Sequence, residues 1–158
     1  MSIGILTDST CDLDQEILEK YEIEVIPLSV HFGEEEFQDR VDITPEDFFE
    51  KLNKIEKIPH TSRPAPALFM EKYKEMLEKY DQLLSIHVSA ALSGTYESAE
   101  LAAREVEAEK ITVIDSASIS LGLGILVFLA AELIEKDKKI DFILEAIKKA
   151  KNNLFLYF

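Results

Sequence analysis

The alternation of short apolar runs with helical segments is the feature that most constrains how this chain can fold. Runs typical of strands occupy residues 2–8, 24–32, 82–89 and 110–116. Segments of helical character lie between and after these runs, at residues 12–21, 43–55, 67–80, 95–107, 119–134 and 141–153. Strands that alternate with helices imply a largely parallel sheet with helices on both of its faces. The expected fold class is therefore α/β.

Local signals refine this outline. Pro27 lies inside the second strand-like run, where it predicts a sheet edge or a bulge. Residues 33–42 are expected to form a turn with a short return strand. Thr44 is predicted to be an N-cap, with Pro45 at the first helical position and Asp47 in the capping-box position.

Composition narrows the function classes. The 158 residues include 17 basic and 31 acidic side chains, which gives a formal charge of -14. Binding to nucleic acid needs clustered Lys and Arg, and the cluster at 147–153 suits the last turn of a helix instead. The single cysteine, Cys11, excludes an internal disulfide and a CxxC centre, and a free thiol fits a reducing, cytoplasmic compartment. The longest apolar run, 119–134, is shorter than the roughly 20 residues that span a bilayer, so we expect a buried helix and no membrane span. The first ten residues have no basic region and no cleavage site, so we expect no signal peptide.

Hydroxyl-bearing residues gather where the expected strands end. They lie at 7–10, 89–95 and 115–118, and at 60–62 in what is expected to be a loop before a helix. In parallel sheets, ligands bind outside the carboxyl ends of the strands. The Ser-Gly-Thr turn at 93–95 would also present unpaired N–H groups at a helix start, which attract phosphate or carboxylate. These loops together predict a site for a small anion.

A simpler interpretation exists for each residue taken alone. Ser and Thr are common N-caps, so a single hydroxyl more often caps a helix than binds a ligand. Asp8 and Asp115 follow apolar strands and are expected to pin loops, and Cys11 is expected to be a small packing residue. His87 alternates with apolar neighbours, which favours a buried, hydrogen-bonded histidine over a catalytic base.

Motifs for other chemistries are missing from the sequence. It contains no GxSxG elbow, no GxxxxGK[ST] phosphate loop and no GxGxxG fingerprint in a suitable context. Its three histidines lack the spacing of metal ligands. A triad of Ser93, His87 and Asp8 can be imagined, but nothing in the spacing selects it. We therefore expect no catalytic residue, no metal and no cofactor.

The same stretches resemble the hallmark blocks of the DegV family, in the same order. They are 5–13 (ILTDSTCDL), 25–30 (VIPLSV), 60–69 (HTSRPAPALF), 84–99 (LSIHVSAALSGTYESA) and 113–124 (VIDSASISLGLG). The resemblance covers nearly the whole chain. It implies that the protein binds a long-chain fatty acid, with the carboxylate on hydroxyls and backbone amides and the tail in an apolar tunnel.

The resemblance also assigns residues. It places the carboxylate at Thr61, Ser62, Ser93 and Gly94, although the Ser62 hydroxyl is expected chiefly to serve the following helix start. Tail contacts are expected from apolar residues beside the motifs: Leu28, Phe69, Leu92, Leu121 and Leu123. One departure is Arg63, where many members carry Gln.

A partner and a second domain are implied as well. The family includes the fatty-acid-binding subunits of bacterial fatty acid kinase, which present the acid to a separate kinase subunit, so the chain is expected to be a lipid-binding protein and not an enzyme. Residues 1–117 are expected to form the N-terminal domain, and residues 118–158 to begin a second domain that is cut short. In this interpretation residues 154–158 are an interrupted strand, and the second domain supplies a cation to the carboxylate.

Two other functions stay open. An enzyme or sensor could bind a small phosphorylated metabolite at the turn 93–95. Alternatively, the protein is a regulatory or structural domain in which the hydroxyl groups only cap helices.

Overall fold

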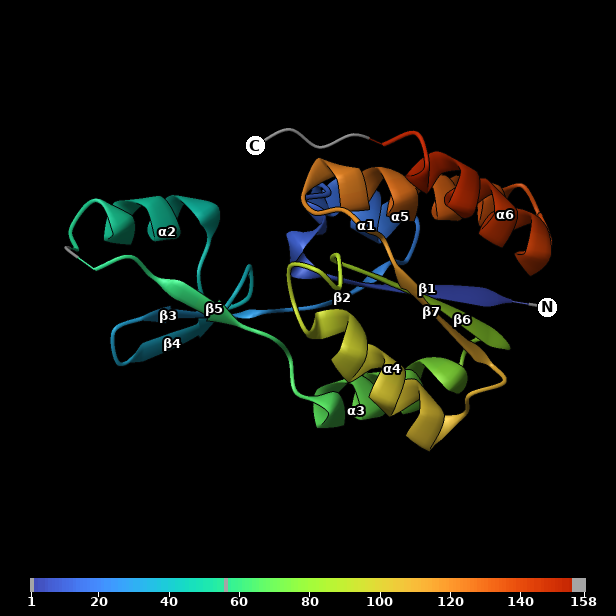
Figure 1. Ribbon diagram of the computed structural model, residues 1–158, viewed down its shortest axis with the longest axis horizontal. Coiled ribbons are helices and arrows are strands. Elements are labelled where there is room, and N and C mark those ends of the chain that lie inside the picture. The colour runs from blue at the N-terminus through green and yellow to red at the C-terminus, as the bar shows by residue number, and fades with distance from the viewer. Residues whose placement is uncertain (1, 56, 155–158) are drawn as a thin grey trace.

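The computed structural model describes residues 2–55 and 57–154 (Figure 1). Its larger sheet is parallel, with the strand order β2-β1-β6-β7. The strands are β1 (Ile3–Asp8), β2 (Glu24–Ile26), β6 (Gln82–His87) and β7 (Ile111–Asp115). Each of them falls in an apolar run that predicted a strand, and their parallel pairing confirms the expected sheet.

Helices cover both faces of this sheet (Figure 1). One face carries α1 (Gln15–Lys20), α5 (Leu121–Glu135) and α6 (Ile140–Lys151), and the other carries α3 (Pro66–Leu77) and α4 (Thr95–Val106). Successive residues of a strand point to opposite faces. In β6, Leu84 and Ile86 join the apolar cluster of α5 and α6, whereas Leu83 packs with α3 and α4. Burial on both faces explains why these strands read as nearly continuous apolar runs.

A second, antiparallel sheet extends from one side of the parallel sheet (Figure 1). Its strand order is β4-β3-β5. The elements are β3 (Ser29–Phe32), β4 (Glu35–Gln38) and β5 (His60–Ser62), with α2 (Pro45–Leu52) beside them. Val30, Phe32 and Ile43 form a small core there, and Phe37 and Phe48 pack against it. The sequence predicted the return strand β4 but not this sheet.

Two expectations for this region are wrong. The run 24–32 is not one strand, because β2 belongs to the parallel sheet and β3 to the antiparallel one. The chain breaks at Pro27, which has no N–H to donate, and at Leu28, whose amide donates to Ser9 Oγ at 3.2 Å. Residues 60–62 are not a loop, because they pair with β3 as strand β5.

The predicted start of one helix is confirmed in detail, and a second predicted helix is found with different burial. Thr44 caps α2: its hydroxyl accepts a hydrogen bond from the Asp47 amide at 3.1 Å, and Asp47 completes the capping box. A helix is confirmed at residues 119–134, as α5, but it is buried on one face only: Leu121 and Ile125 are 63% and 52% exposed. A Cβ atom on Gly124 would lie 2.4 Å from the Cys11 carbonyl oxygen, so glycine is what allows the turn after β1 to approach α5. No helix in the described residues is both long and apolar enough to cross a membrane.

The last two helices belong to the same packed layers as the rest. α5 and α6 share one apolar cluster with Ile5 of β1 and Leu84 of β6. The division of the chain into 1–117 and 118–158 stays a prediction. The strand expected at 154–158 lies outside the described residues except for Leu154, which is not in a strand.

Candidate functional site

The strand order creates a switch point between β1 and β6. The chain moves from β1 to β2 on one side of the sheet, and from β6 to β7 on the other. Loops that leave the carboxyl ends of the two central strands therefore diverge and leave a crevice, where ligands usually bind in such sheets. The short 3-10 turn Ser9–Cys11 follows β1, and residues 88–94 follow β6.

A hollow of about 440 Å³ opens at this edge, and we call it the switch-point hollow. Its lining residues come from the strand-end loops and from β5: Thr10, Leu28, Thr61, Arg63, Val88, Leu92, Ser93, Gly94 and Ile119. Apolar side chains alternate here with hydroxyls, and Arg63 is the one charged residue in the lining. Such a lining suits an anion that carries an apolar part. Thr10 belongs to one of the hydroxyl-rich strand ends that predicted the site, whereas Val88 and Ile119 were not assigned to it, although each lies beside such a strand end.

The turn 93–95 is built as the start of α4. Gly94 is the N-cap, and its carbonyl accepts a hydrogen bond from the Ser98 amide at 3.0 Å. Ser93 Oγ accepts from the Thr95 amide at 3.3 Å and lies 2.9 Å from Thr95 Oγ1. Ser93 therefore does not cap α4, because Gly94 is the N-cap and no side chain caps this helix; its hydroxyl instead makes a local turn bond, and the same residue lines the hollow.

Arg63 lies across this helix start. Its Nη1 atom donates to the Gly94 carbonyl and to the Glu97 carboxylate, both at 3.1 Å. A Cβ atom on Gly94 would lie 2.1 Å from that nitrogen, so the glycine is required for such a close approach. The Arg63 and Glu97 side chains are 52% and 66% exposed, which leaves the ion pair open to solvent.

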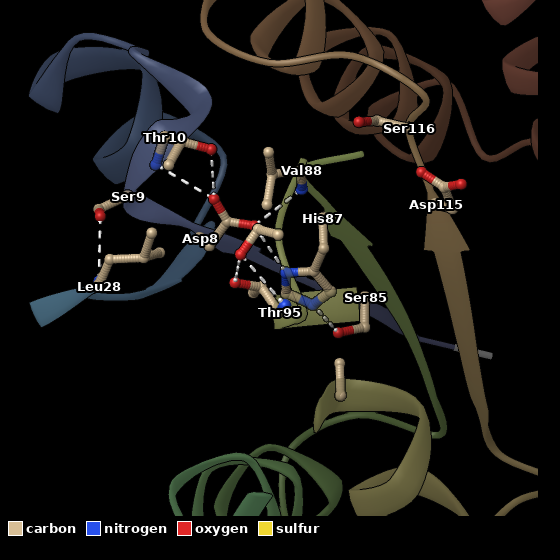
Figure 2. Close-up of polar contacts among 12 residues, drawn as sticks. Asp8, Ser9, Thr10, Leu28, Ser85, His87, Val88, Thr95, Asp115 and Ser116 are labelled. Atoms are coloured by element: carbon tan, nitrogen blue, oxygen red, sulfur yellow. Dashed lines mark hydrogen bonds and ion pairs between the residues drawn. The ribbon is translucent and has the colours of Figure 1, made fainter. Parts of the chain in front are cut away.

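The Asp8 carboxylate contacts Thr10 and Val88, two residues that line the hollow, and Figure 2 shows these contacts. Its Oδ1 atom accepts hydrogen bonds from the amide and the hydroxyl of Thr10. Its Oδ2 atom accepts from the Val88 amide at 2.9 Å and lies 3.0 Å from His87 Nδ1. Burial by itself would raise the pKa of Asp8, but the hydrogen bonds from His87, Thr10 and Val88 and the attraction of His87 hold it below the ordinary 3.8.

The two strand-end aspartates thus do what the sequence predicts of them. Asp8 is fully buried and ties the turn after β1 to the start of the loop after β6. Asp115, at the end of β7, accepts from the amides of Ala90 and Ala117 at 3.1 and 2.8 Å. Both therefore pin loops, and Cys11 is a buried packing residue in the cluster under α5.

His87 continues a buried chain of polar groups (Figure 2). Its Nε2 atom lies 2.6 Å from Ser85 Oγ, which in turn lies 2.8 Å from the Tyr73 hydroxyl. Because an ionised carboxylate can only accept, the Nδ1 atom of His87 carries the proton that points at Asp8. Burial raises the pKa of Tyr73, so its hydroxyl stays protonated and can donate to Ser85. The buried, hydrogen-bonded histidine is confirmed.

The order Ser85, His87, Asp8 is that of a hydrolytic triad, but its surroundings do not suit hydrolysis. Ser85 is fully buried on the sheet face that α3 and α4 cover, and its oxygen is already bonded to Tyr73. A substrate carbonyl cannot reach that oxygen in this conformation. The serine bonded to His87 is thus Ser85 and not Ser93. We interpret this chain of groups as a rigid support for the hollow.

Several residues assigned from the resemblance lie away from the hollow. Ser62 does not line it; its hydroxyl lies 3.0 Å from His31 Nε2, and the expected role at the helix start is wrong because Ala65 is the N-cap of α3. Phe69 and Leu123 are fully buried in the two apolar clusters on opposite faces of the sheet, and Leu121 is 63% exposed on α5. Their role as tail contacts stays a prediction.

Other parts of the molecule fit an anion less well. A hollow of about 640 Å³ lies between α1, β2 and the start of α2. Its rim carries more acidic than basic side chains: Glu19, Glu22, Glu24 and Asp39 against Arg40 and Lys79. Within the described part of the chain, no group of three or more His, Cys, Asp or Glu residues could hold a metal ion.

Comparisons with known proteins identify the family. The family model described as "Uncharacterised protein, DegV family" matches residues 2–158. The chain belongs to the DegV family. A DegV domain-containing protein from Clostridium perfringens is 42% identical over 152 residues, which are 96% of this chain and 54% of the relative.

Solved DegV structures share this fold. A DegV family protein from Thermus thermophilus, described by its fatty acid binding, has a TM-score of 0.90 at 38% identity. DegV from Bacillus subtilis, described as a fatty acid binding protein, also has a TM-score of 0.90, at 32% identity. Each comparison covers 96% of this chain and 54% of the other. The present chain therefore spans about half the length of the relatives that it matches.

Proposed function

We propose that this DegV chain binds a long-chain fatty acid in the switch-point hollow. The observation that carries the proposal is that the lining is partly polar and partly apolar. Hydroxyl groups and the start of α4 lie beside apolar side chains. A carboxylate would accept hydrogen bonds from Thr61, Ser93 and the Gly94 amide, and the tail would leave along Leu28 and Leu92. The fatty-acid-binding relatives from Thermus and Bacillus support this proposal.

The two candidate hydroxyls on β5 make different contacts. Neighbouring residues of a strand point to opposite faces; Thr61 pairs with Val30 and lines the hollow, whereas Ser62 contacts His31. The proposal therefore depends on Thr61 and does not need Ser62. This difference also supplies a matched control, because the same strand offers one hydroxyl inside the hollow and one outside it.

Titration with oleate tests the proposal. Removing one hydroxyl that bonds a charged group should weaken binding by about ten- to a hundredfold, so Thr61→Ala and Ser93→Ala should both lose affinity. Ser62→Ala, the control, should bind nearly as well as the wild type. Native mass spectrometry of freshly purified protein should also reveal a bound acyl chain. Unchanged oleate affinity in both site variants would exclude this assignment.

We further propose that the chain presents the acid to a separate kinase subunit in the cytoplasm and performs no chemistry alone. The resemblance to the subunits of fatty acid kinase supports this role. Thr61 is exposed, so a carboxylate beside it would remain within reach of a second protein. Incubation of the chain alone with ATP and oleate should yield no acyl phosphate. Its formation without a second protein would contradict the proposal.

A second candidate ligand is a small phosphorylated metabolite. The start of the 12-residue helix α4 favours it, because helix N-termini bind phosphate through their free amides. The apolar part of the lining would then have no partner in the ligand. A phosphorylated compound that copurifies with the protein, together with no binding of oleate, would favour this candidate.

A further inference from the structure

We infer that Arg63 supplies the positive charge that holds the ligand's carboxylate, so that the hollow selects ionised acids over neutral lipids with the same tail. This inference rests on the proposed function and adds the basis of head-group selection. Arg63 is the one charged residue in the lining, and it shares the hollow with Thr61, Ser93 and Gly94. The expectation from the family assigned the cation to a second domain, so a cation within residues 1–117 is a separate claim.

The contacts of the guanidinium leave donors for a ligand. Both of its hydrogen bonds to Gly94 and Glu97 use Nη1. A guanidinium carries five N–H donors in a planar fork that matches a carboxylate. Within the described part of the chain, the hydrogen bonds and the ion pair of the Arg63 side chain all use Nη1, and none uses Nη2 or Nε. A carboxylate could therefore bind this free edge while Nη1 keeps its two protein contacts.

The ion pair with Glu97 positions the Arg63 side chain and leaves its positive charge available to a ligand. Exposed pairs of this kind are weak and are screened by salt, and this one is exposed on both sides. Gly94 fixes the guanidinium against the start of α4, where the amides of the helix add to the positive potential. Arginine keeps its charge at any physiological pH. The charge of Arg63 and the start of α4 thus lie side by side in the lining of the hollow.

The test compares two probes in four proteins by calorimetric titration. The probes are oleate and oleyl alcohol, which share a tail and differ in charge. The proteins are wild type, Arg63→Gln, Arg63→Lys and the control Arg104→Gln. Arg104 forms a similar exposed ion pair with Glu100 at 3.0 Å. Both residues lie on α4, which also carries Glu97, but outside the lining of the hollow.

We expect Arg63→Gln to weaken oleate binding about tenfold or more, with little effect on oleyl alcohol. Arg63→Lys should lose less, and Arg104→Gln should leave both affinities unchanged. Equal loss for both probes would mean that Arg63 only braces the fold, and no loss for either would mean that it does not touch the ligand; each result overturns the inference. If the wild type binds oleate, the proposed function survives either result. If the wild type binds neither probe, both the proposed function and this inference fail.

Discussion

Replacing Asp8 with Asn tests whether the polar chain behind the hollow stabilises the fold. The substitution keeps the size of the side chain and removes its charge. In the wild type the carboxylate accepts hydrogen bonds from Thr10, His87 and Val88 and is fully buried. An amide offers one oxygen and one NH₂ group, so it cannot accept on both sides.

The expected loss of stability follows from this mismatch. If the amide oxygen faces Thr10, the NH₂ group faces the Val88 N–H and His87 Nδ1, which are both donors in the wild type. A change of tautomer could rescue His87, but the Val88 amide would still lack an acceptor. Each buried donor without a partner costs about 1–3 kcal/mol, so we expect Asp8→Asn to lower the free energy of unfolding by about 3 kcal/mol. For a chain of this size that corresponds to a melting temperature lower by about 6–12 °C.

Urea and thermal unfolding followed by circular dichroism measure this loss. Asp115→Asn is the matched control, because both hydrogen bonds of the Asp115 side chain end on Oδ1, which an amide can retain. We expect the control to change the free energy of unfolding by less than about 0.5 kcal/mol. An Asp8→Asn protein as stable as the control would refute the reasoning.

The pH dependence gives an independent check on Asp8. Its pKa in the folded protein lies below the ordinary 3.8, so the ionised form stabilises the fold fully above about pH 3.8. That contribution is lost as the pH falls through the folded-state pKa. The difference in stability between wild type and Asp8→Asn should therefore be greatest near neutral pH and should shrink in stronger acid. A difference that does not depend on pH would show that the charge of Asp8 is unimportant.

Two further predictions concern the contact between α5 and the turn after β1. Gly124→Ala should destabilise the protein by about 1–3 kcal/mol, despite the better helix propensity of alanine, because the new Cβ would lie 2.4 Å from the Cys11 carbonyl oxygen and 3.1 Å from Leu13 Cδ2; a gain of stability in urea unfolding would contradict this. Cys11 is 2% exposed and burial raises the pKa of its thiol, so a thiol reagent should modify the native protein much more slowly than the urea-unfolded chain; equal rates would contradict the burial.

The parallel sheet could be predicted because its signals are local. Each of its strands is an apolar run, and the two-sided burial of β6 appears directly in residues 83–88. The capping box at Thr44 is likewise contained within a few residues. The location of the hollow also followed, because topology brings the ends of parallel strands to one edge. That a ligand binds in this hollow stays a prediction.

The antiparallel sheet and the supports of the hollow could not be predicted in this way. β5 consists of three exposed residues, and it becomes a strand only because β3 lies beside it. The partner of His87 is Asp8, 79 residues away in the sequence. The contact between Arg63 and Gly94 depends on the chain entering α3 over the start of α4. Each of these is a contact between residues that are far apart in the sequence. Such contacts leave no periodic pattern in a single sequence from which they could be predicted.

The Ser93 hydroxyl makes a local bond in the turn before α4 and still has a proton to offer a ligand. A serine hydroxyl can donate one hydrogen bond and accept two. Ser93 Oγ accepts from the Thr95 amide, and if the Thr95 hydroxyl also donates to it, both acceptor positions are used. The Ser93 proton is then free to point into the hollow, toward a carboxylate. The local bonds with Thr95 thus orient the donor without using its proton, and Ser93→Ala should lose ligand affinity even where α4 remains intact.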